Sequence, residues 1–347
     1  MGKRRMGLAV VGAAVSLSLV AAACGGGSDG GGTTGTTGGD LNGTITISGS
    51  STVQPVSNLV AELFNQDVAP NVSISVDGPG TGDGFVLFCK GETDIQDASR
   101  AIEPEEAAAC KKAGIDYVEL EIALDGITVM TNPANSVSCL NLGDLYALFG
   151  PESQGFTSWS DANTLASEVG GTGNFPDAPL QITAPGEESG TYDAFITLAG
   201  IEDTALSRGV SEADAAALRK DYQPSPDDNV IISAMEGSPS ALGFVGFAYA
   251  QNAGAQVKEI QVDGGSGCVA PTAQTIADAS YPLSRSLYLY VNTAKLADNP
   301  AVKAFIDYYL TDNGLVASVT EAGYVQLPAD RIDATRSTWN GVATPSG

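Results

Sequence analysis

Three short turns rich in glycine and hydroxyl residues have a composition suited to binding an oxyanion. They are residues 49–53 (GSSTV), 78–84 (GPGTGDG) and 188–191 (ESGT), and each leads into a stretch with helical character. The first turn of a helix leaves backbone N–H groups unpaired at the positive end of the helix dipole. Serine and threonine hydroxyls add neutral donors, so such turns can hold a tetrahedral anion. Each turn alone is weak evidence, whereas three turns between strands favour a binding function.

The turns lie within an alternation of strand and helix patterns. Residues 44–48 and 72–76 alternate apolar and polar side chains as strands do, and apolar side chains recur at helical spacing after the first turn. This alternation predicts an α/β protein with a mixed or parallel sheet covered by helices. Further strands are expected at 117–123, 127–131, 180–184 and 286–291, and further helices at 104–112, 211–220 and 302–310. Breaks near 131–138 and 270–284 predict two lobes between which the chain crosses twice.

The N-terminus is typical of a secreted lipoprotein. A basic start (KRR) precedes the apolar run 7–23, and Cys24 follows three alanines. We expect residues 1–24 to be a signal peptide with lipidation at Cys24; a plain secretory signal is the alternative. Residues 25–40 are almost all Gly, Thr and Ser, which predicts a flexible linker. The mature protein is therefore expected outside the cytoplasm, anchored to the cell membrane through its lipid.

The amino-acid composition limits which partners the protein can bind and which reactions it can catalyse. The chain has 41 Asp and Glu against 16 Lys and Arg, a net charge of −25, which argues against nucleic acid and anionic lipid as partners. A buried site for a small anion stays possible, because distant charges are screened within about 8–10 Å. Histidine is absent, which removes His-dependent catalytic triads and most transition-metal sites. We expect no metal, no cofactor and no enzymatic activity.

The cysteines after Cys24 predict two disulfides. They are Cys89, Cys110, Cys139 and Cys268, an even number without a CxxC pair, in a compartment that favours oxidation. Three pairings are possible. We favour Cys89–Cys110 with Cys139–Cys268, the first because only a short loop must close.

These motifs and their order resemble those of the phosphate-binding lipoproteins of bacterial ABC importers, a family of type II periplasmic binding proteins. The matching runs cover nearly the whole mature chain: 48–55, 78–85, 91–102 (GETDIQDASRAI), 123–133 (ALDGITVMTNP), 188–195 (ESGTYDAF), 241–249 and 281–291 (YPLSRSLYLYV). The resemblance implies mixed central sheets flanked by helices and a ligand cleft between two lobes. Lobe I would comprise residues 41–132 and 281–347, and lobe II residues 133–280.

The resemblance also implies the residues that hold phosphate. The first two turns would supply Ser51, Thr52, Val53 and Thr81, and the far lobe Ser189, Gly190 and Thr191. The chain departs from the pattern of many relatives at two positions. Arg100 stands where many have an aspartate, as in another branch of the family, and Pro185 stands where many have an arginine. The arginine of the ligand site would then lie on the opposite wall of the cleft from the arginine of those relatives.

Each candidate also has a structural interpretation. The planar fork of Arg100 matches two oxyanion oxygens, but this side chain could instead pair with Asp94 or Glu103. The turn hydroxyls could serve as helix caps, because a cap and an anion ligand use the same geometry. Asp125 could accept the proton of hydrogen phosphate and so exclude sulfate, or it could be a turn carboxylate before Gly126.

Three further polar residues are given structural roles. Asp83 is a third possible proton acceptor, but its position favours a first-turn helix acid. Ser284 and Arg285 are expected to belong to the structure between the lobes.

These observations predict a monomeric, non-enzymatic receptor that captures inorganic phosphate and delivers it to an ABC permease. Closure of the lobes would complete a set of donors that neither lobe supplies alone. One alternative keeps the fold and changes the ligand to sulfate, molybdate or a phosphate ester. Another is a surface sensing or adhesion protein. An enzyme is disfavoured because Ser189 has no evident activating base.

Overall fold

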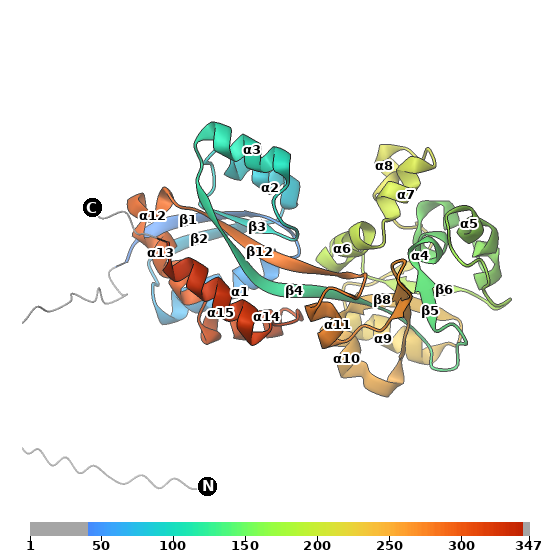
Figure 1. Ribbon diagram of the computed structural model, residues 1–347. Helices are drawn as coiled ribbons and strands as arrows, with labels where there is room; N and C mark the ends of the chain where they lie inside the picture. Colours follow the sequence, from blue (N-terminus) through green and yellow to red (C-terminus); the bar gives the residue numbers. More distant parts are fainter. Residues whose placement is uncertain (1–40, 343–347) are drawn as a thin grey trace, which may run out of the picture. The chain divides into compact units, whose positions relative to one another are not determined.

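The computed structural model describes residues 41–342 (Figure 1). The predicted signal peptide, Cys24 and the linker 25–40 lie outside these residues. Within the described range, no helix is long and apolar enough to cross a membrane. No group of three or more His, Cys, Asp or Glu side chains in that range could hold a metal ion.

Most strands join one mixed sheet with the order β2-β1-β3-β12-β4-β8-β6-β7, and β9 pairs with β4. β1 pairs in parallel with β2 and β3, whereas β12 is antiparallel to β3 and β4. The strands of this sheet are β1 Gly43–Gly49, β2 Val72–Asp77, β3 Ile95–Ala98, β4 Tyr117–Thr131, β6 Gln181–Ala184, β7 Gln223–Pro224, β8 Ala241–Gly246, β9 Lys258–Glu259 and β12 Ser284–Asn292. A small second sheet contains β5 Cys139–Asn141, β10 Gln261–Asp263 and β11 Cys268–Val269.

Helices follow most strands, as the alternating pattern predicted. Local signals fix several of their starts: Pro104 begins α3, where Glu103 and Glu106 form a capping box. The helices are α1 Gln54–Asp67, α2 Thr81–Phe88, α3 Pro104–Ala113, α4 Leu142–Phe149, α5 Asn163–Glu168, α6 Gly190–Leu198, α7 Ile201–Ser207, α8 Glu212–Ala215, α9 Asp228–Gly237, α10 Phe247–Ala253, α11 Ala273–Ala277, α12 Lys295–Asp298, α13 Pro300–Tyr309, α14 Ala317–Glu321 and α15 Ala329–Asn340.

The strands predicted at 117–123 and 127–131 are confirmed, but they form one continuous strand, β4, and the alternative of a turn at Asp125 is wrong. Asp125 and Gly126 suggest a turn in sequence, yet both are paired across the sheet. Asp125 lies opposite Arg285, and Gly126 lies opposite Ser284 of β12. From Ile127 onward the strand pairs with β8 instead. Continuous hydrogen bonding to two successive partners therefore keeps the chain extended through a dipeptide that would otherwise favour a turn.

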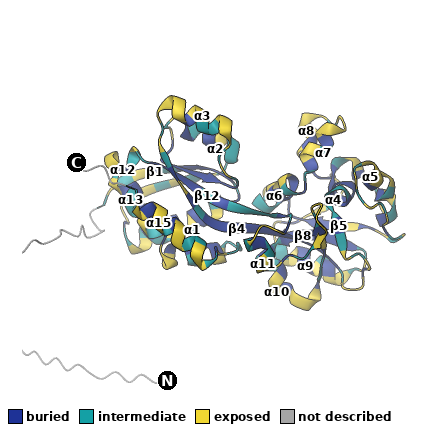
Figure 2. Ribbon diagram, viewed as in Figure 1, coloured by how far each residue is buried: buried dark blue, intermediate teal, exposed yellow. Residues whose placement is uncertain are grey.

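Two large hydrophobic clusters share β4. One takes its buried residues from 45–123 and 287–339, and the other takes them from 124–283 together with Leu327. Figure 2 shows the central strands β4 and β12 largely buried, while the outer faces of helices such as α3 and α8 are exposed. The change of cluster falls at residues 123–124 on β4. The lobe boundaries at 132 and 281 stay a prediction.

The predicted helix at 211–220 is much shorter than expected. Only Glu212–Ala215 is α-helical, in α8. Beyond it, the backbone N–H of Leu218 donates to the Tyr192 hydroxyl, and the N–H of Arg219 donates to the carbonyl of Phe149. These tertiary hydrogen bonds replace the helical ones, which alanine-rich sequence alone does not reveal.

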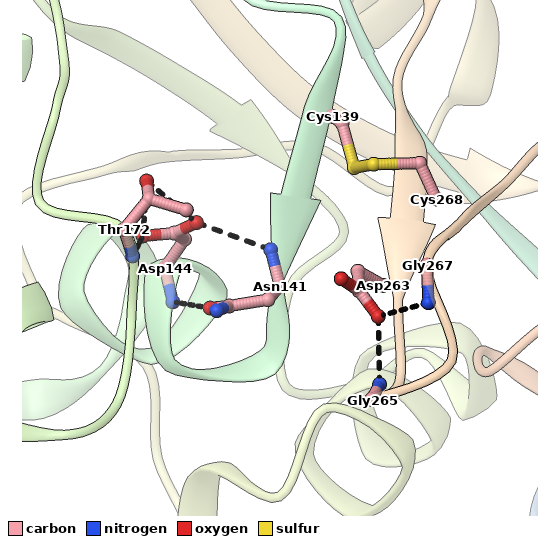
Figure 3. The surroundings of a disulfide bond; sticks show 8 residues. All are labelled: Cys139, Asn141, Asp144, Thr172, Asp263, Gly265, Gly267 and Cys268. Atoms are coloured by element: carbon pink, nitrogen blue, oxygen red, sulfur yellow. Dashed lines mark hydrogen bonds between the residues drawn. A yellow bond between two sulfur atoms is a disulfide. The ribbon is translucent and has the colours of Figure 1, made fainter.

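The structure contains two disulfides, Cys89–Cys110 and Cys139–Cys268, which are the pairs favoured from the sequence. The first joins the end of α2 to α3. The second joins β5 to β11 in the small sheet, as Figure 3 shows. Beside it, an Asp263 carboxylate oxygen accepts hydrogen bonds from the N–H groups of Gly265 and Gly267 at 2.7 and 2.9 Å. The disulfide and this closed turn together fix the edge of the small sheet.

Candidate functional site

The first glycine turn is shaped by a close backbone contact. Gly49 ends β1 with φ +146°, and a Cβ there would lie 2.0 Å from the carbonyl oxygen of Asp97. Glycine is therefore required at this position. The N–H groups of Thr52 and Val53 lie 3.1 and 3.4 Å from Ser50 Oγ, so both already have an acceptor. Val53 is fully buried, whereas Thr52 reaches the cavity described below.

The second turn presents a hydroxyl at the start of α2. Gly80, with φ +109°, is the N-cap residue, and Thr81 is the first residue of the helix. Thr81 Oγ1 accepts a hydrogen bond from the Ser99 N–H and contacts Ser99 Oγ, both at 3.1 Å. This links the turn to the end of β3. The linkage positions the Thr81 and Ser99 hydroxyls side by side at the N-terminus of α2.

The third turn caps α6 and lies against the first turn. Ser189 is the N-cap, and its Oγ accepts from the N–H of Thr191 at 3.2 Å. Thr52 Oγ1 donates to the carbonyl of Gly190 at 3.2 Å. A Cβ on Gly190 would come within 3.0 Å of Thr52 Cα, so glycine permits this approach. Ser189 therefore acts as a helix cap in the structure, whereas α1 and α2 have no side-chain cap.

A cavity of about 340 Å³ is lined by residues of the first two turns, of β12 and of helix α6. It brings together four of the predicted ligands, Ser51, Thr52, Thr81 and Arg100. The other predicted ligands, Val53, Asp125, Ser189, Gly190 and Thr191, are not in its lining. The complete lining is Ser50, Ser51, Thr52, Gly80, Thr81, Ser99, Arg100, Asp193, Thr197, Leu198 and Arg285. Hydroxyls and two guanidinium groups therefore supply most of its hydrogen-bond donors.

Arg100 lines the cavity and is also paired with carboxylates. Nη1 and Nη2 each lie 2.8 Å from an oxygen of Glu106, and Nε lies 3.3 Å from Glu103. Its side chain is 36% exposed. The Glu106 hydrogen bonds raise the pKa of Arg100 further above its ordinary value, although burial opposes them. Of the two alternative partners considered for Arg100, Glu103 is found, whereas Asp94 accepts a hydrogen bond from the Thr46 N–H and lies 3.7 Å from Lys295.

Arg285 is a functional candidate that the sequence reasoning missed. Sequence reasoning places it in the structure between the lobes, yet the residue lines the cavity. Nη2 donates to Thr52 Oγ1 at 2.8 Å, and Nε donates to Asp125 Oδ2 at 3.2 Å. No hydrogen bond within the described residues uses Nη1. The available signal was the one charged residue of β12, which antiparallel pairing places opposite Asp125.

Asp125 lies behind Arg285 rather than at the cavity surface. The residue is only 3% exposed. Burial raises the pKa of the Asp125 carboxyl, and the charge and hydrogen bond of Arg285 oppose this. A carboxylate in this position compensates the arginine and fixes its orientation. The expectation that Asp125 touches the ligand is therefore not supported by its position.

A second buried carboxyl group lies near the first turn. Asp97 is fully buried, and its Oδ1 accepts from Ser57 Oγ at 3.0 Å. Ser57 Oγ also contacts the Tyr309 hydroxyl at 3.2 Å. Within the described part of the chain, no ion pair reaches Asp97, and burial raises its pKa to about 8. Burial therefore favours the protonated, uncharged form of the Asp97 carboxyl.

Comparisons with known proteins identify similar chains. The model of the PBP superfamily domain matches residues 33–313. Protein SphX of Synechocystis sp. is 37% identical over 85% of this chain and 82% of its own length. The phosphate-binding protein PstS of Staphylococcus haemolyticus is 34% identical over 83% of each chain.

One solved structure is similar over nearly its full length. The crystal structure of a possible phosphate binding protein from Planctomyces limnophilus matches with a TM-score of 0.76 and 34% identity. The match covers 87% of this chain and 99% of that chain.

Proposed function

The chain belongs to the PBP superfamily, and from this premise we propose that it captures inorganic phosphate in the cavity and delivers it to an ABC permease. Relatives named as phosphate-binding proteins, at more than 30% identity over most of the chain, support this assignment. The proposal describes an extracytoplasmic binding protein that carries out no chemical step on its ligand. We expect phosphatase assays to show no activity.

The proposal depends on the hydrogen-bond donors that line the cavity. Thr52 and Thr81 provide hydroxyls, and Arg100 and Arg285 provide guanidinium groups. Guanidinium forks and hydroxyl donors match the tetrahedral array of phosphate oxygens. The N-terminus of α2 at Gly80 adds the positive end of a helix dipole. A small oxyanion is the ligand class that satisfies all of these donors together.

The other predicted ligand residues lie next to these hydrogen-bond donors but do not line the cavity. The N–H groups of Val53 and Thr191 contact Ser50 Oγ and Ser189 Oγ. We propose that phosphate competes with these hydroxyls for the amides, and that Gly190 leaves room for its approach. Asp125 then acts by orienting Arg285, not as a direct ligand.

We also propose how the chain is divided into lobes and how the protein is held at the membrane. Lobe I would comprise residues 41–132 and 281–347, and lobe II residues 133–280. The protein would be a monomer without a cofactor, held at the cell membrane by a lipid on Cys24. The distribution of the full-length protein between membrane and soluble fractions tests the anchor, which recovery in the soluble fraction alone would contradict.

Calorimetric titration of the purified protein with phosphate, sulfate and molybdate tests the ligand. We expect saturable binding of phosphate at one site, with sulfate and molybdate at least about tenfold weaker, because closely placed donors and acceptors discriminate between similar anions. Tighter binding of sulfate or molybdate would assign the cavity to another oxyanion. Failure of all three anions to bind would refute a role in oxyanion capture and leave a sensing or adhesion role to examine.

A further inference from the structure

A second cavity, of about 370 Å³, lies at one edge of the main sheet and shares no lining residue with the first. Its wall includes residues of β6, of β7, which ends the strand order of the sheet, and of the loop 156–157. Its volume is within the range of about 300–1,000 Å³ that is typical of small-molecule sites. The cavity is therefore large enough for a ligand other than the one at the glycine turns.

The buried polar group of this second cavity is Arg219, which is 4% exposed. Nε and Nη2 donate to the two carboxylate oxygens of Asp221 at 2.6 and 2.8 Å. Nη2 also donates to the carbonyl of Phe156 at 2.7 Å. Nη1 is buried and has no hydrogen-bond partner within the described residues. Because buried donors are nearly always paired, Nη1 marks a position where an added acceptor would be stabilising.

Uncharged polar side chains line the same cavity. Thr183 of β6 lies opposite Gln223 of β7 in a parallel pair, and Gln181 lies two residues before Thr183, so these three side chains share one face of the sheet. Thr157 adds a hydroxyl. No hydrogen bond within the described residues uses any of these four side chains. Since amides and hydroxyls both donate and accept, the wall offers donors and acceptors together.

The charges and the shape of this cavity disfavour several classes of ligand. The hydrogen bonds from Arg219 hold the pKa of the Asp221 carboxyl below its ordinary value, so the guanidinium is already compensated and attracts an anion weakly. A peptide strand would gain little from the sheet edge, because β7 has two residues and Pro224 has no N–H. An apolar ligand would leave the polar wall without partners. A compact, neutral ligand with both donors and acceptors fits best.

We propose that this second cavity binds a neutral mono- or disaccharide. Adjacent sugar hydroxyls each donate and accept, which matches the planar amides of Gln181 and Gln223. A sugar oxygen also supplies the acceptor that Arg219 Nη1 lacks. The half-buried Phe156 offers an apolar surface to the C–H groups of the ring. Sugar binding here does not depend on phosphate binding at the glycine turns.

Saturation-transfer NMR on the full chain tests the site with glucose, galactose, mannose, N-acetylglucosamine, maltose and cellobiose. We expect at least one of these sugars to bind saturably and to shift the side-chain amide signals of Gln181 and Gln223 in nitrogen–proton correlation spectra. Glucuronate and galacturonate carry a carboxylate in place of the hydroxymethyl group. They should bind more weakly than their parent sugars, because Arg219 is already paired with a carboxylate.

Two variants and a matched control locate the binding. Gln181→Ala and Gln223→Ala each remove one amide from the wall, and both residues are exposed, so the fold should be preserved. We expect each variant to weaken sugar binding about three- to tenfold, as the loss of one or two hydrogen bonds predicts. Phosphate affinity should stay unchanged. Gln274→Ala makes the same change at an exposed position of α11 that does not line this cavity, and sugar affinity should not fall.

Three outcomes would overturn the sugar site. They are no saturable binding of any of the six sugars, tighter binding of a uronate than of its parent sugar, and a sugar affinity that both wall variants leave unchanged or that Gln274→Ala lowers equally. In each case, phosphate binding by the wild-type protein would leave the proposed function intact. Absence of phosphate binding alongside saturable sugar binding would instead refute the proposed function and leave the sugar site standing.

Discussion

Arg285 and Arg100 reach the same cavity from different surroundings. Arg285 lies on β12, its side chain is 13% exposed, and the buried Asp125 lies directly opposite on β4. Arg100 follows β3, its side chain is 36% exposed, and it pairs with Glu103 and Glu106. Both guanidinium groups therefore have carboxylate partners, but only one pair is shielded from water.

The difference bears on how each arginine can bind an anion. In the buried pair, one carboxylate oxygen fixes Nε, while Nη1 makes no hydrogen bond within the described residues. Arg100 uses both terminal nitrogens on Glu106, so an anion must compete with that carboxylate. Interactions in a shielded site are also less weakened by solvent than exposed ones. We expect Arg285 to contribute more to phosphate affinity than Arg100.

The largest effect should come from Arg285→Lys. Lysine keeps the charge beside Asp125 but cannot reproduce the planar fork, so the bond to Thr52 and the donor Nη1 are lost. We expect the dissociation constant for phosphate to rise about 100-fold by calorimetry. Thermal unfolding should show that the variant is folded. A loss smaller than that of Arg100→Ala would reverse the order of the two arginines.

Arg100→Ala should have a smaller effect. Its removal deletes one guanidinium from the cavity wall while leaving Glu103 and Glu106 exposed enough to be solvated. We expect phosphate affinity to fall by at least about tenfold in the same titration. Unchanged affinity would remove Arg100 from the site and reduce it to a surface ion pair.

Glu106→Gln should have the smallest effect, and in the opposite direction. The amide oxygen can still accept the hydrogen bond from the Glu103 N–H that caps α3, so the helix start is preserved. Its charge no longer competes with the ligand for Arg100. We expect a gain in phosphate affinity of about two- to threefold, since an ion pair still in contact with solvent contributes little. If affinity falls instead, Glu106 positions Arg100 for binding rather than competing with the anion.

The fold was largely predictable from sequence because local patterns and long-range structure agree. The α/β class and the family resemblance are confirmed. The strand pattern at 44–48 and 72–76 corresponds to β1 and β2. The errors came from residues whose partners are distant in sequence. Asp125 and Gly126 look like a turn until β12 and β8 pair with them, and the helix after Ser211 ends early because Phe149 and Tyr192 bind its backbone.

The site was predictable only in part for the same reason. Turn composition identified Thr52 and Thr81, whose positions follow from local sequence. The cavity-facing roles of Arg285 and Asp193 depend on which elements meet. Arg285 requires the register of β12 against β4, and Asp193 requires α6 to lie against the first turn. Neither relation is encoded in the residues adjacent to these side chains.

The position of Asp125 and Arg285 on β4 and β12 affects how this protein can change during evolution or redesign. Both strands contribute to large hydrophobic clusters, so replacing this pair puts the stability of the fold at risk along with the affinity. Asp193 and Thr197 lie one helical turn apart on the exposed face of α6, where substitutions are tolerated more easily. New anion preferences should therefore arise on that helix first, while the paired strands stay constant.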